Sequence, residues 1–124
     1  MMWPAQLEPL YFFATDPVAN DIFDLLKRYY EYWSPDPTPD ANTTAKKALC
    51  NVLDYLNKLA PDYKFLEIRS MGYVGNLFEM KRYLDQGNYV MACSMLCNVI
   101  EYYPISAPGI RANVINLLSH YLGE

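Results

Sequence analysis

Hydrophobic residues recur every three or four positions along most of this chain, which is the period of amphipathic α-helices. The clearest pattern runs from Pro17 to Ser34, with Asp16 as the expected N-cap residue and proline at the first helical position. A shorter helix is expected over residues 4–14. The residues expected to face inward from the longer helix are Val18, Ile22, Leu25, Leu26, Tyr29, Tyr30 and Trp33.

A proline-rich segment follows the first long helix. Residues 34–40 alternate proline with polar residues, and each proline disfavours helix at the residue before it. We therefore expect an extended connection at the surface. A helix capped by Asn42, Thr43 or Thr44 should follow it and end before Pro61.

The second half of the chain contains further helical patterns. Residues 62–73 fit either a helix or a short strand, and helix is favoured because a lone strand would have nothing to pair with. Gly72 and Gly75 indicate a break, after which a helix continues and ends at Gly87. Asn88 is placed to cap the next helix. The last two helices are expected over residues 89–103 and 108–122.

Two of these helices share a sequence pattern. The run over residues 49–55 recurs 47 residues later over residues 96–102, and Ala45 recurs as Ala92. Helical hairpins and short solenoids use one kind of packing face repeatedly in this way. The sequence therefore predicts one all-α domain over residues 1–124, a compact bundle or short solenoid of five to seven helices built from helical hairpins.

The charge of the chain limits its partners. There are 14 acidic and 10 basic residues, which give a formal net charge of -4 and a pI near 4.9. This charge opposes direct binding to nucleic-acid phosphates and suits a basic partner. No apolar run approaches the roughly 20 residues that span a bilayer, and the segment after Met1 lacks the basic flank of a secretory signal. We therefore expect a soluble cytoplasmic protein with no nucleic-acid or membrane partner.

Residues with reactive side chains are few and scattered. Cys50, Cys93 and Cys97 lie within apolar helical patterns, which is typical of reduced thiols in a core. A metal would need further ligands, and the single histidine, His120, is distant in the sequence. Neither the spacing of a calcium loop nor that of a phosphate-binding glycine loop is present. The sequence predicts no catalytic, cofactor or metal site, and no enzyme activity.

Acidic and aromatic residues gather around the end of the first long helix and the proline-rich connection. They fit a solvated surface without a function. They also fit a contact patch, in which acids attract a basic partner and aromatic side chains become buried anchors. The candidate contact residues are Asp24, Glu31, Tyr32, Trp33, Asp36 and Asp40.

A hairpin in the second half has the spacing of a tetratricopeptide-like repeat over about 25 residues, with glycine at the turn, alanine between the helices and proline at the end. The residues that carry this resemblance are Tyr83, Gly87, Asn88, Tyr89, Ala92, Leu96, Val99, Ile100 and Pro104. The resemblance implies a helical adaptor that holds a peptide, or a homodimer, with a concave groove lined by helices over residues 74–103.

A second resemblance covers residues 84–122. The features that carry it are a glycine turn, the Leu96-Cys97 pair in a helix rich in alanine and leucine, the Pro-Ile-Ser connection over residues 104–106, and the closing helix. With these features, this stretch resembles small immunity proteins of bacterial contact-dependent inhibition and polymorphic toxin systems. This resemblance implies a cytoplasmic non-enzyme that binds a toxin domain and occludes its active site. The acidic charge suggests a basic, nuclease-type toxin. A phage- or plasmid-borne acidic inhibitor of a nucleic-acid-binding defence complex is the alternative.

Overall fold

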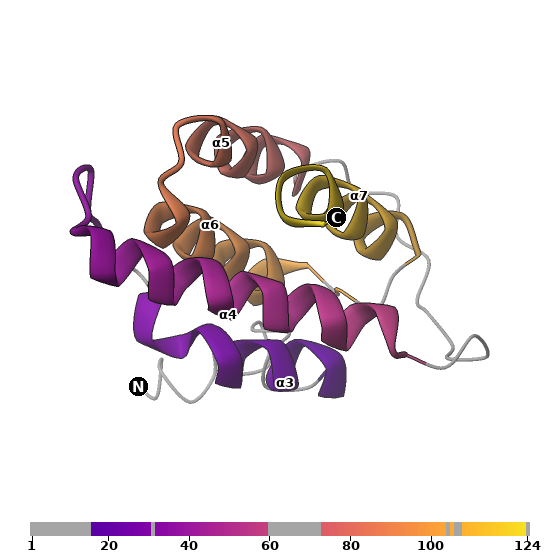
Figure 1. The fold of residues 1–124 in the computed structure, drawn as a ribbon. Helices are drawn as coiled ribbons and strands as arrows, with labels where there is room; N and C mark the ends of the chain where they lie inside the picture. The colour runs from indigo at the N-terminus through magenta and orange to yellow at the C-terminus, as the bar shows by residue number, and fades with distance from the viewer. Residues whose placement is uncertain (1–15, 31, 60–72, 104, 106–107, 124) are drawn as a thin grey trace, which may run out of the picture.

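The computed structural model describes residues 16–30, 32–59, 73–103, 105 and 108–123 (Figure 1). Within these ranges five α-helices pack against one another and there is no strand, which confirms the all-α prediction. The helices are α3 (Pro17–Leu26), α4 (Pro39–Asn57), α5 (Tyr73–Asp85), α6 (Tyr89–Tyr102) and α7 (Pro108–Leu122), with one turn of 3₁₀ helix, η2 (Lys27–Tyr29), after α3. The helix expected over residues 4–14, and all but the last residue of the ambiguous segment 62–73, lie outside the described residues.

Helix α6 lies at the centre of the bundle. It contacts α3, η2, α4 and α5, while α7 packs against α4 and α5 (Figure 1). The sequence of α6 is apolar around most of its circumference, and a helix of that kind is stable when neighbours cover it on all sides. Its buried apolar residues are Val90, Met91, Ala92, Cys93, Leu96, Cys97, Val99 and Ile100.

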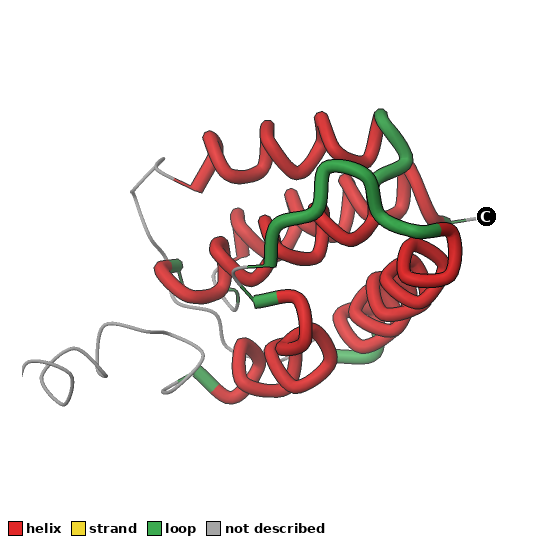
Figure 2. The backbone as a smooth tube through the Cα atoms, turned by 90° about the vertical axis from the view of Figure 1, so that its left-hand side faces the viewer, coloured by secondary structure: helices red, strands yellow, loops and turns green. Residues whose placement is uncertain are grey.

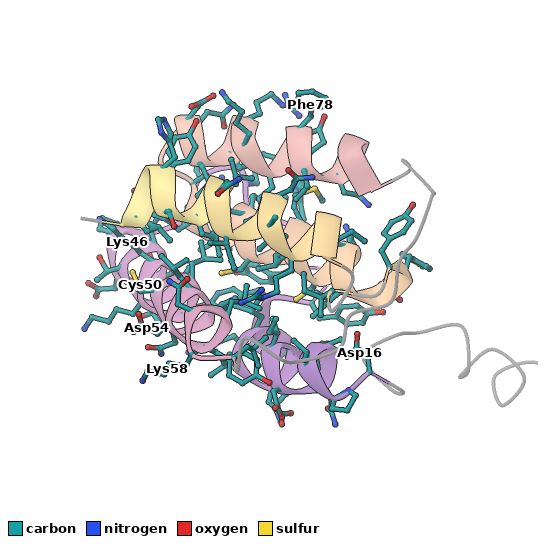
Figure 3. The ribbon with its side chains drawn as sticks, turned by 90° about the vertical axis from the view of Figure 1, so that its right-hand side faces the viewer. Asp16, Lys46, Cys50, Asp54, Lys58 and Phe78 are labelled. Carbon is teal, nitrogen blue, oxygen red and sulfur yellow. The ribbon has the colours of Figure 1, made fainter. Side chains whose placement is uncertain are left out.

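The repeated runs of α4 and α6 use the same packing face. Ala45, Leu49 and Val52 of α4 are fully buried, and so are their counterparts in α6. The two copies differ on the opposite side. Asp54 points outward from α4 (Figure 3), whereas Glu101 at the equivalent position of α6 is buried. This difference follows from position, because α6 is enclosed by other helices and α4 keeps one face open to solvent.

Several helix ends agree with the sequence predictions. The Asp16 carboxylate accepts a hydrogen bond from the Val18 N–H at 3.0 Å and caps α3. Gly87 has a φ of 74°, a left-handed conformation that glycine adopts without strain and that ends α5. Asn88 caps α6 by accepting from the Met91 N–H at 3.0 Å.

The first long helix is shorter than predicted. Helix α3 gives way to η2, so the prediction of a helix reaching Ser34 was wrong. Leu25 and Trp33, both expected to face inward, are exposed, Trp33 by 67%. The backbone becomes extended at Tyr30, whose hydroxyl donates to the buried Glu101 carboxylate of α6 at 2.5 Å. Tertiary contacts of this kind override helical periodicity.

Two other predicted boundaries were wrong. Helix α4 begins at Pro39 rather than after a cap at residues 42–44, because the Thr38 side chain accepts from the Ala41 N–H at 3.2 Å. Thr38 and Pro39 therefore begin α4 in the way that Asp16 and Pro17 begin α3, with a capping side chain followed by proline at the first helical position. Gly75, predicted to mark a break, lies inside α5. Glycine lowers the stability of a helix by about 1 kcal/mol without preventing its formation.

Candidate protein-binding surface

Two large aromatic side chains extend from the connection between η2 and α4. Tyr32 is 50% exposed and Trp33 is 67% exposed. Asp36 lies in the same connection and Asp40 lies in the first turn of α4, and both are exposed. We call Tyr32, Trp33, Asp36 and Asp40 the aromatic-acidic surface. In Figure 2 the connection crosses the end of the bundle that faces the viewer.

The two carboxylates of this surface are both exposed to solvent. Among the described residues neither Asp36 nor Asp40 forms an ion pair. Asp24, in contrast, lies on α3 and pairs with Lys27 at 3.8 Å, so this candidate already has a local cation. Glu31, the remaining candidate, lies outside the described residues.

A recess of about 310 Å³ lies between η2 and the first turns of α4. Tyr32 and Asp40 both line it, so the fold brings an aromatic ring and a carboxylate of the predicted patch to one hollow. On another wall the Arg28 guanidinium lies 5.6 Å from the centre of the Tyr29 ring, a cation–π contact. The other lining residues are Ala41, Thr44 and Val90.

A second recess, of about 340 Å³, extends the surface toward the turn between α5 and α6. Asp36 lines it together with the two prolines that flank it. The lining residues are Pro35, Asp36, Pro37, Asn42, Gln86, Gly87 and Asn88. The connection and the α5–α6 turn therefore form one continuous face, although they are distant in the sequence.

Hydrogen bonds from α6 hold the connection in place. The Asn88 side-chain Nδ2 donates to the carbonyl oxygens of Ser34 at 3.0 Å and Pro35 at 3.3 Å. The Ser34 N–H in turn donates to the Met91 sulfur at 3.1 Å. The backbone next to Trp33 is thus fixed to the start of the central helix.

A second asparagine fixes α4 to the same region. The Asn42 Nδ2 donates to the Gly87 carbonyl oxygen at 2.6 Å, and its Oδ1 accepts from the Tyr89 N–H at 2.7 Å. We call Asn42 and Asn88 the asparagine clamp. Together they join the start of α4, the α5–α6 turn and the connection that carries the exposed aromatic residues.

The asparagine clamp is not predicted by the sequence. From the sequence, Asn88 is expected only to cap a helix, and Asn42 is only one of three possible caps. The partners of these side chains in the clamp lie 45 to 54 positions away in the chain. Hydrophobic periodicity reveals buried apolar faces, and it does not reveal which distant backbone groups an asparagine will bond. A single sequence offered no sign of this role.

Phe78 belongs to a different surface. It is 65% exposed and extends outward from α5 (Figure 3). It lines a mainly apolar groove of about 240 Å³ between α5 and α7, together with Leu77, Lys81, Asn113 and Leu117. The adaptor interpretation placed a groove along residues 74–103, whereas one wall of this groove comes from α7.

The thiols of α6 are poorly suited to chemistry. Burial raises the pKa of the Cys97 thiol to about 12 and raises that of Cys93 well above its ordinary value. Both thiols therefore stay protonated near neutral pH, and the thiolate is the form that attacks electrophiles or binds metals. His120 is exposed, with its ring 4.8 Å from that of Tyr121.

The described residues contain neither a candidate metal site nor a candidate membrane span. Within them, no three or more histidine, cysteine, aspartate or glutamate side chains are grouped so that they could hold a metal ion. None of the helices resolved in these ranges is long and apolar enough to cross a bilayer.

Comparisons with protein-family models, with curated proteins and with solved structures found no match to this chain. The function is therefore inferred from the surface itself. Exposed tyrosine and tryptophan side chains are enriched at surfaces that bind other proteins, and within the described part of the chain the neighbouring Asp36 and Asp40 have no ion-pair partner.

Proposed function

We propose that this chain is a non-enzymatic binding protein whose aromatic-acidic surface recognises a basic surface of another protein. The observation that supports this proposal is the exposure of Tyr32 and Trp33 beside Asp36 and Asp40, on a connection fixed by hydrogen bonds. Tryptophan and tyrosine are the residues that most often carry binding energy at protein interfaces. The carboxylates would speed encounter with a basic partner and exclude acidic ones.

The hydrogen bonds that anchor the connection favour tight binding. A flexible loop loses conformational freedom when a partner orders it, and this cost is subtracted from the affinity. Here the hydrogen bonds from Asn88, and the bond from Ser34 to Met91, already order the backbone beside Trp33. The backbone next to the aromatic side chains is therefore held in place in advance of binding.

The partner we propose is a basic, nuclease-type toxin domain, which would make this chain an immunity protein acting in the bacterial cytoplasm. A cleft that binds nucleic acid is positively charged, and an acidic surface with aromatic anchors is complementary to it. Occupation of that cleft would block the substrate. The net charge of -4 supports this choice of partner.

A capture experiment with matched variants tests the proposal. The tagged chain, its Trp33→Ala variant and its Phe78→Ala variant would each be incubated with extract of the source cells, and the retained proteins identified by mass spectrometry. Trp33 and Phe78 have nearly equal exposure but lie on different surfaces. The wild-type chain and Phe78→Ala should retain one basic protein that Trp33→Ala loses.

The opposite pattern would contradict the proposal. Loss of the partner on Phe78→Ala alone would place binding in the groove between α5 and α7, as in a helical adaptor. Retention of only acidic proteins, or only of further copies of this chain, would also overturn it. If the captured protein is a nuclease, adding the wild-type chain in equal amount should abolish its cleavage of DNA or RNA. Cleavage that continues when the nuclease is saturated with the chain would exclude blockage of the active site.

A further inference from the structure

We infer that Asn88 is a positioning residue for the aromatic-acidic surface, so that partner binding depends on a side chain that the partner does not touch. This inference rests on the proposed function. Asn88 borders the second recess but is only 6% exposed, which leaves little of its side chain for a partner to contact. Its influence on binding would pass through the connection that carries Tyr32 and Trp33.

The Asn88 amide makes bonds in two directions. Its Oδ1 accepts from the Met91 N–H at 3.0 Å and caps α6. Its Nδ2 donates to Ser34 and Pro35 of the connection, at 3.0 and 3.3 Å. A primary amide is the short neutral side chain that offers an acceptor and two donor hydrogens at once.

This double role explains why asparagine occupies the position. Aspartate or serine would cap α6 as well as asparagine does, because a cap requires only an acceptor oxygen. Neither supplies the amide donors that reach the two carbonyl oxygens. The requirement for donors therefore comes from the connection and not from the helix.

The Asn88→Asp variant separates the two roles. The carboxylate keeps the cap but loses both donors, and it faces two carbonyl oxygens. The added negative charge would strengthen attraction to a basic partner if charge alone decided affinity. Loss of the positioning bonds should instead weaken binding, so the two explanations predict opposite signs.

The first measurement concerns the connection and needs no partner. In a Trp3→Phe background Trp33 is the single tryptophan, so its fluorescence anisotropy decay reports motion of the connection. Asn88→Asp should increase the amplitude of fast motion at Trp33 and speed hydrogen exchange of the Ser34 amide. Asn116→Asp, which makes the same charge change at an exposed site on α7, should change neither.

The second measurement is the affinity for the basic domain retained by the wild-type chain. Loss of two positioning hydrogen bonds should weaken binding by on the order of tenfold. Asn88→Ser, which caps α6 without adding a charge, should act in the same direction and provides a second test if Asn88→Asp does not fold. Circular dichroism would confirm the helical content of each variant.

The outcomes are distinguishable. Unchanged motion at Trp33 in both variants, or increased motion with unchanged affinity, would overturn the positioning role. Tighter binding by Asn88→Asp would show that charge dominates and would also overturn it. Failure of the wild-type chain to retain any basic protein would contradict the proposed function, while the anisotropy and exchange data would still decide whether Asn88 holds the connection.

Discussion

Replacing Asn42 with alanine should lower the free energy of unfolding by about 1.5 kcal/mol. Asn42 makes two hydrogen bonds, at 2.6 Å to the Gly87 oxygen and at 2.7 Å from the Tyr89 N–H. Each contributes about 1 kcal/mol net, and their loss leaves two backbone groups without these partners. Alanine is the better helix former by about 0.5 kcal/mol, which offsets part of the loss.

The matched control for this prediction is Asn51→Ala. Asn51 is exposed on the same helix, so its replacement changes helix propensity alone and should raise stability by about 0.5 kcal/mol. Urea unfolding followed by circular dichroism would measure both variants against wild type. Equal effects of the two replacements would refute the reasoning, because the bonds from Asn42 would then contribute nothing to the fold.

Other predictions concern burial and titration. Ile100 is fully buried, so Ile100→Ala should lower the free energy of unfolding by about 2–5 kcal/mol, as measured in urea. Trp33→Ala should lower it by less than about 1 kcal/mol, because Trp33 is exposed. Similar losses in the two variants would place Trp33 in the core. Iodoacetamide near pH 8 should leave Cys93 and Cys97 unmodified in the folded protein and alkylate both in urea, as read by mass spectrometry. Burial raises the pKa of the Cys97 thiol from 9.0 to about 12, so the folded chain holds this proton more tightly than the unfolded chain does. The resulting contribution to the free energy of unfolding is fully present below pH 9 and is lost as the pH rises toward 12. Cys97→Ala should reduce this alkaline loss by up to about 4 kcal/mol, and an unchanged pH profile would contradict the assignment.

The features of the fold that the sequence predicts are those with local causes. Asp16 before Pro17, and Gly87 before Asn88, mark helix ends because each residue acts on the backbone beside it. Apolar periodicity also predicted the buried faces of α4 and α6, including Ala45 and its counterpart. Nearest-neighbour chemistry is sufficient for these features.

The end of α3 depended on distant residues and was predicted wrongly. The helical pattern continues to Trp33, but the backbone is already extended at Tyr30, whose hydroxyl bonds to Glu101, 71 positions away. The sequence grouped Tyr32, Trp33, Asp36 and Asp40 because they lie close together in the chain, yet Trp33 was also expected to face inward. The clamp residues Asn42 and Asn88 escaped prediction for the same reason, since their partners come together only in the folded chain.

Photo-crosslinking inside the source cells would test the central claim most directly. The photoreactive residue p-benzoylphenylalanine would be placed at position 41 in one variant, because Ala41 is exposed and lines the recess beside Tyr32 and Asp40 without being an anchor, and at position 78 in another, on the separate groove. We predict a covalent adduct with a basic protein from position 41 and none from position 78. Adducts only from position 78, or adducts from position 41 only with acidic proteins or with a second copy of this chain, would contradict it.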